Sequence, residues 1–161
     1  MILGMSTAAF TLVHVIVSLV AIGTGCVVVW GMLTSRRLPF WTGIFLASTA
    51  LTCLSGFLFP YYEMTPAIKI GIVTMFVLLL AAVARYGRGL ATTWREIYVV
   101  CSILALYFNV FVLIVQSIEK VPALRALSPN QSGAPVVLMQ LATLALFVVV
   151  TIYALKRFRN P

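Results

Sequence analysis

The side chains that could do chemistry in this chain are few, and most are amides, hydroxyls or a single imidazole set in apolar sequence. Ser102, Asn109 and Gln116 follow one another at intervals of seven residues, within a stretch of Leu, Val, Ile, Phe and Tyr. Such intervals place side chains on one face of a helix. An amide in hydrocarbon is costly unless it is hydrogen-bonded, so this face is expected to look into protein.

Several polar side chains are expected in the same half of a helical bundle, when depth is counted at about 1.5 Å per residue along each apolar segment. The hypothesis is a small polar cavity that binds a ligand and is lined by His14, Ser18, Ser55, Asn109, Gln116 and Gln140. Its mouth is expected to carry Glu63, Lys69 and Glu119. The alternative is that these groups only join helix to helix, a role that Asn and Gln often have in membranes.

Other chemistry is disfavoured by the residues present. A haem held by two histidines, or a metal centre, needs more ligands than the one histidine offers. The cysteines at 26, 53 and 101 lie inside apolar runs and form no CxxC pair. We therefore predict no metal and no cofactor. An acid–base enzyme that uses His14 with Glu119 stays open as a second alternative, and it needs the two within hydrogen-bond reach.

The composition indicates an integral membrane protein. The chain has 161 residues, of which 63% are hydrophobic and 9% are charged, whereas a soluble domain carries about 25% charged residues. The net charge of +8 comes from basic residues at the ends of apolar segments. Such residues are orientation signals in membrane proteins, so no nucleic-acid partner is expected.

Five apolar segments each approach the roughly 20 residues needed to cross the hydrocarbon. The prediction is one all-α domain over residues 1–161, an integral membrane bundle of five transmembrane helices. The spans are expected at about 7–33, 39–59, 66–84, 94–119 and 135–155. A capping box at Thr93–Glu96 is expected to open the fourth span. A short turn of helix is expected between Pro122 and Leu127.

Small and polar residues recur at steps of three and four in every span, and such stripes are how membrane helices associate. The fifth span has the stripe Gln140, Thr143, Phe147, Thr151 and Ala154. We predict that each stripe faces the interior of the bundle.

The basic residues favour one orientation. With five spans, one side receives Arg36, Arg37, Arg85, Arg88, Arg95, Lys156, Arg157 and Arg159, and the other receives Lys69, Lys120 and Arg125. Because positive charge collects on the cytoplasmic side, we predict an outside N-terminus and a cytoplasmic C-terminus. The expected location is the bacterial cytoplasmic (inner) membrane.

Two segments carry a resemblance. Residues 105–116, followed by 120–124, and the run Gly56–Pro60 resemble a pattern in small uncharacterised bacterial multi-pass membrane proteins. The resemblance implies the fold and a bacterial origin. It implies no activity, because that group has none assigned.

Three functions follow from these observations. The leading interpretation is a non-catalytic accessory or structural subunit that acts within the bilayer, as a homo-oligomer or in a larger membrane complex. The first alternative is binding or transport of a small solute through an outward-facing polar cavity. The second is a membrane-embedded enzyme that uses His14; a catalytic role is less expected than a non-catalytic one.

Overall fold

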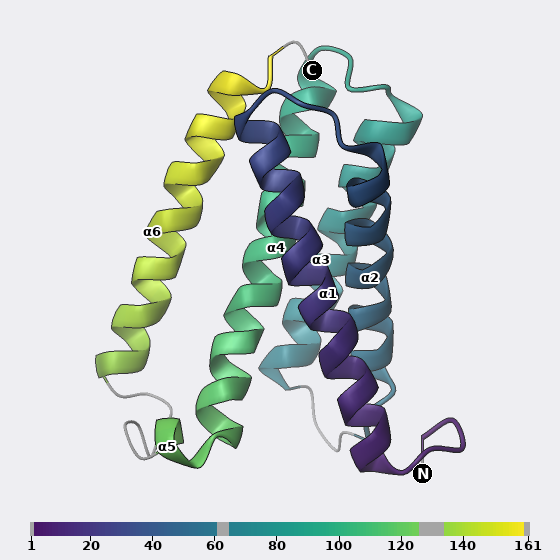
Figure 1. Cartoon of the computed structure of the whole chain (residues 1–161), viewed down its shortest axis with the longest axis vertical. Coiled ribbons are helices and arrows are strands. Elements are labelled where there is room, and N and C mark those ends of the chain that lie inside the picture. Colours follow the sequence, from purple (N-terminus) through teal and green to yellow (C-terminus); the bar gives the residue numbers. More distant parts are fainter. Residues whose placement is uncertain (1, 61–64, 126–133, 160–161) are drawn as a thin grey trace.

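The computed structural model describes residues 2–60, 65–125 and 134–159, and this part of the chain is all-α. The long helices are α1 (Thr7–Leu33), α2 (Pro39–Phe57), α3 (Pro66–Ala82), α4 (Thr93–Lys120) and α6 (Ala134–Arg157). A π-helical turn, η1 (Val83–Gly87), continues α3, and a short helix, α5 (Pro122–Arg125), follows α4. All five long helices run roughly along the long axis of the molecule (Figure 1).

Each of the five helices is long and apolar enough to span a membrane, which confirms the predicted all-α bundle. The expected ends were right to within two residues, apart from the π-turn that carries the third span on to Gly87. The second span ends at Phe57, two residues before the predicted end. There the backbone N–H of Leu58 donates to Ser55 O (3.2 Å) and closes a tighter final turn.

The helix starts show which local signals the chain uses. The Ser6 hydroxyl accepts a hydrogen bond from the Ala9 N–H (3.2 Å), and Thr65 does the same for Ile68 (3.3 Å). These bonds satisfy donors that have no partner in the first turn of a helix.

The capping box predicted at Thr93–Glu96 is wrong. The helix begins one residue earlier than expected, so Thr92 is the cap, and it makes no side-chain capping bond. The Glu96 carboxylate lies 3.0 Å from the Arg95 guanidinium. With Thr92 as the cap, Glu96 is the fourth residue of the helix, one position beyond the third, where the carboxylate of a capping box stands.

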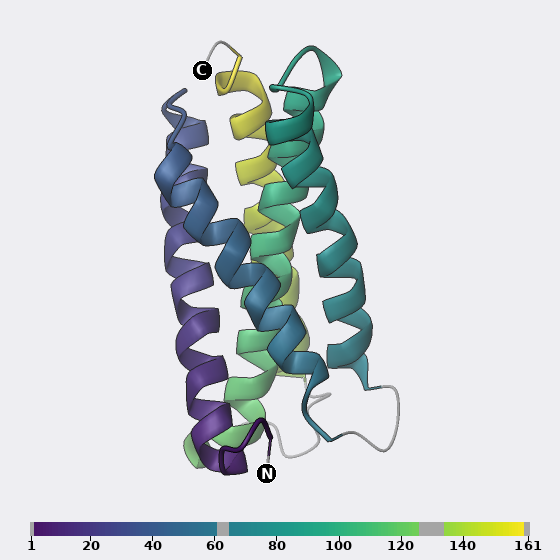
Figure 2. The same ribbon diagram turned by 90° about the vertical axis from the view of Figure 1, so that its right-hand side faces the viewer.

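The long helix α4 is central to the packing. It contacts α1, α3 and α6, and α2 packs against α1 and α3. In the turned view α2 runs obliquely between α1 and α3 (Figure 2). Helix α6 stands at the side of the bundle, and only 6% of its most apolar window is buried (Figure 1). Most of α6 is therefore available to lipid.

The predicted stripes face inward. The five stripe residues of α6 are all buried or half-buried, while most of their neighbours on the helix are exposed. On α1, Gly25 allows the closest approach: a Cβ there would lie 2.7 Å from Leu106 Cδ1 and 2.9 Å from Phe45 Cε2. This contact joins α1, α2 and α4 around a core that includes Phe45, Leu78, Ile103 and Leu106.

Candidate functional site

A cavity of about 340 Å³ lies between α1, α2, α3 and α4, in the half of the bundle that carries the N-terminus. Four of the six predicted site residues line it: His14, Ser18, Asn109 and Gln116. The rest of the wall is mainly apolar, with Phe57, Ile68, Val112 and Leu113 among its members.

His14 and Ser55 meet across α1 and α2. The imidazole Nδ1 lies 2.7 Å from Ser55 Oγ, and Oγ lies 2.6 Å from the carbonyl oxygen of Leu51. The Ser55 hydroxyl has one hydrogen and two lone pairs, so it accepts from Nδ1–H in one tautomer of the ring and donates to Nδ1 in the other. In either tautomer Nε2 has no hydrogen-bond partner among the residues that the structure describes. Ser55 itself orients the ring and does not line the cavity.

Asn109 joins α4 to α2. Its Nδ2 donates to the hydroxyl of buried Thr49 over 3.3 Å, while the residue also lines the cavity. Gln116 lies two helical turns nearer the end of α4. It makes no side-chain hydrogen bond to any described residue, so its amide keeps both donors and its acceptor for another molecule.

Four hydroxyls of the wall are satisfied within their own helices, those of Thr11, Ser18, Thr52 and Thr74. Ser18 donates to Val15 O over 2.8 Å, and Thr52 donates to Ser48 O over 2.9 Å. Because a helix carbonyl already receives each of these protons, the hydroxyls need no external acceptor. The polar groups of the wall that remain for a ligand are the imidazole, the two amides, the Ser117 hydroxyl and the Lys120 ammonium group.

Gln140 and Glu119 are not brought into the cavity either. Gln140 lies on α6, where its Nε2 contacts the carbonyl oxygen of Phe111 at 3.4 Å. Its Oε1 is buried without a hydrogen-bond partner in the described part of the chain. Glu119, half-buried at the end of α4, does not line the cavity either and forms no ion pair with His14 in the described residues.

The expected mouth is also different. Lys69 is exposed and is not part of the wall, and Glu63 lies outside the described residues. Lys120, which we counted only as an orientation signal and did not predict for the site, lines the cavity. Helical spacing was the available signal, because Lys120 follows Gln116 by four residues and so shares its face.

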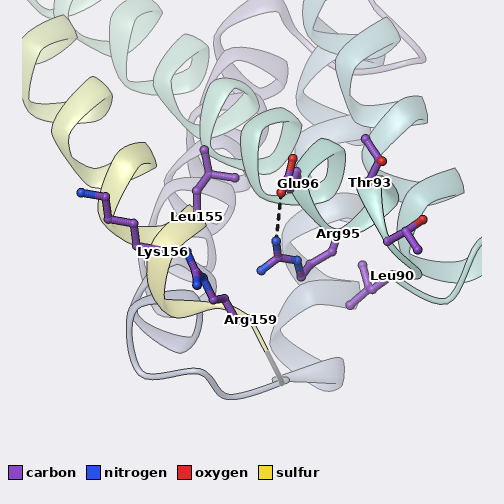
Figure 3. Close-up of a pocket in the computed structure, with 8 residues that line it drawn as sticks. Leu90, Thr93, Arg95, Glu96, Leu155, Lys156 and Arg159 are labelled. Atoms are coloured by element: carbon purple, nitrogen blue, oxygen red, sulfur yellow. Dashed lines mark hydrogen bonds and ion pairs between the residues drawn. The ribbon is translucent and has the colours of Figure 1, made fainter.

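A second, wider hollow of about 740 Å³ lies at the opposite end, between the start of α4 and the end of α6. Arg95 lines this hollow. Its Nη2 donates to the Glu96 carboxylate (3.0 Å), and its Nη1 donates to the carbonyl oxygen of Phe158 (2.7 Å). Figure 3 shows Lys156 directed away from Arg95. The guanidinium is thus engaged in tying the C-terminal residues to α4, and we assign this hollow a structural role.

The described residues contain no group of three or more His, Cys, Asp or Glu side chains that could hold a metal ion. All three cysteines are free thiols.

The fold and the wall of the cavity define a class of protein. The chain is a multi-pass, all-α membrane protein, whose five long apolar helices imply contact with a lipid bilayer. Comparison with known protein families, with curated proteins and with solved structures finds no match.

Proposed function

We propose that the protein binds a small molecule in the cavity between α1, α2, α3 and α4. The volume of about 340 Å³ falls at the lower end of the 300–1,000 Å³ that is usual for ligand sites. Its wall is apolar with a few convergent polar groups, as such sites generally are. The polypeptide then serves as a membrane-embedded receptor or as the binding part of a transport system.

One observation carries this proposal. His14 and Gln116 line a shared cavity, and neither His14 Nε2 nor the Gln116 amide makes a hydrogen bond with the described residues. Polar groups at membrane depth are costly unless they find partners. Water or a polar ligand in the cavity supplies those partners.

An accessory or structural role requires only that the helices pack together. Asn109 and Thr49 serve such packing, since their bond joins two helices. A cavity with unused polar groups is the feature that a purely structural role leaves unexplained. We therefore favour ligand binding over the accessory role, and over an enzyme that pairs His14 with a carboxylate.

The proposal includes an orientation. Eight basic residues belong to the end of the bundle opposite the cavity, and by the positive-inside rule that end lies in the cytoplasm. In a bacterial inner membrane the cavity then faces the outside. A ligand would enter past the first turns of α1 and α3.

Cysteine labelling tests the cavity. In a variant with Ala at positions 26, 53 and 101, we introduce either Ser18→Cys or Gln116→Cys and treat intact membranes with a water-soluble thiol reagent. Both thiols are expected to react, because the cavity admits water from the outside. Failure of both to react from either side of the membrane would refute the proposal.

Leu19→Cys is the matched control. It lies one residue from Ser18 but on the outer face of α1, with 48% of the side chain exposed in the isolated chain. In a membrane that face meets lipid, so its thiol should react far more slowly. If the thiols at positions 18 and 19 are labelled at equal rates, the two faces of α1 are equally accessible to water. That result would contradict a cavity on one face of α1 and lipid on the other.

A further inference from the structure

The charges around the cavity carry information about its ligand. Lys120 is the only charged side chain in the described wall, and no carboxylate belongs to that wall. Glu119 precedes Lys120 in the chain but does not line the cavity. Over the described residues Lys120 forms no ion pair.

The helix dipole explains only part of what is observed at Lys120. It is the last residue of α4, where the helix dipole favours a cation. That accounts for a basic residue at this position. It does not account for a side chain that borders the cavity, within electrostatic reach of His14, and has no carboxylate beside it in the described wall.

The cavity is elongated and its body is apolar. Asn109 and Lys120 are eleven residues apart on α4, which corresponds to about 16 Å along the helix. Between these two levels the wall includes Val112 and Leu113 of α4 and Ile68 of α3. The end of the cavity at Lys120 therefore offers a cation. The rest of the cavity, toward Asn109, offers mainly apolar side chains and two amide groups.

We infer that the ligand is a small amphipathic carboxylate, with its charged group at Lys120 and its apolar chain directed toward Asn109. A carboxylate accepts hydrogen bonds from the ammonium group, and the Gln116 amide can donate a further one. A cationic ligand would meet Lys120 as a like charge. This inference rests on the proposed function, since it needs a cavity that binds.

The test uses protection of a thiol at the mouth. Ser117 lines the cavity, so Ser117→Cys in the variant without native cysteines reports on occupancy. The protein is reconstituted in vesicles of one fixed lipid composition, and labelling rates are measured with added octanoate, octan-1-ol or octylammonium. Each rate is divided by the rate of the same variant without additive.

Lys120→Gln and Lys69→Gln are then compared in this reporter. Lys69, like Lys120, is an exposed lysine at the same end of the bundle, but it lies outside the cavity wall. For each protein we take the concentration of octanol that halves the labelling rate and divide it by the concentration of octanoate that does so. Partition of the two compounds into the vesicles is the same for all variants, so it cancels when these ratios are compared. We expect this ratio to fall about tenfold in Lys120→Gln, the value of one charge-assisted hydrogen bond, and to stay unchanged in Lys69→Gln.

The outcomes separate the two proposals. If the unliganded reporter labels from water but the ratio is the same in all three proteins, or octylammonium protects best, the carboxylate inference is overturned and the binding cavity stands. If none of the three compounds protects, the inference also fails. If the reporter does not label from water, the proposed function fails and the inference fails with it.

Discussion

The imidazole of His14 on α1 is hydrogen-bonded to the hydroxyl of Ser55 on α2, with 2.7 Å between Nδ1 and Oγ. The bond joins residues 41 positions apart in the chain. It fixes the ring on the wall of the cavity, where the edge of Phe59 also packs against it with 5.4 Å between ring centroids.

The first prediction concerns this bond. Ser55→Ala leaves His14 Nδ1 without its hydrogen-bond partner, and the free energy of unfolding in detergent should fall by about 1 kcal/mol. The ¹⁵N shift of Nδ1 should also change, because the hydrogen bond to this atom is lost. Thr143→Ala is the control, since that hydroxyl bonds only to Met139 O in its own helix. Equal losses in the two variants would contradict the assignment.

The second prediction concerns the approach of α1 to its neighbours. Gly25→Ala would place a methyl group 2.7 Å from Leu106 Cδ1, so the core must shift, at a cost of about 1–3 kcal/mol. Gly23→Ala, on the same helix, meets nothing within 4 Å and should change stability little. Thermal unfolding of both variants in one detergent measures the difference. A Gly25 variant as stable as the Gly23 variant would show that the close contact does not form.

The third prediction concerns the bond between α4 and α2. A double-mutant cycle of Asn109→Ala and Thr49→Ala should give a coupling energy of about 0.6 kcal/mol, the usual value between membrane helices. Reversible unfolding in mixed micelles supplies the four free energies. Strict additivity would mean that the 3.3 Å contact contributes nothing, and Asn109 would then serve the cavity alone.

The fourth prediction concerns Arg95. Its Nη1 holds the carbonyl oxygen of Phe158, so Arg95→Gln should loosen the C-terminal residues from α4. Hydrogen exchange in the peptide that contains Phe158 should become faster. Arg37→Gln removes an exposed basic residue from the same end of the bundle and should leave that exchange unchanged. Faster exchange in both variants would point to net charge as the cause.

The fifth prediction concerns orientation. A fluorescent protein fused after Pro161 should fluoresce in bacteria, and alkaline phosphatase fused there should stay inactive, because the basic end is expected in the cytoplasm. Active phosphatase at that position would place the cavity on the cytoplasmic side. The binding proposal would then need an intracellular ligand.

The sequence alone determined the five spans and the inward face of each. Apolar length and the three-and-four spacing of small residues are local properties, so the stripe that ends in Ala154 could be assigned to the interior without knowing its neighbours. The capping box at Thr93 shows the limit of such local reasoning, because the helix starts one residue earlier and Glu96 then no longer stands three residues after the cap.

Only the tertiary structure decided which polar groups share a cavity. Depth along a helix placed Gln140 beside His14 and Gln116, but α6 packs on the outer side of α4, so Gln140 reaches Phe111 instead. Lys120 entered the site because the rotation of α4 turns the Gln116 face toward α1, α2 and α3. Helix rotation and neighbour choice follow from packing between segments distant in the chain, and spacing within one segment does not encode them.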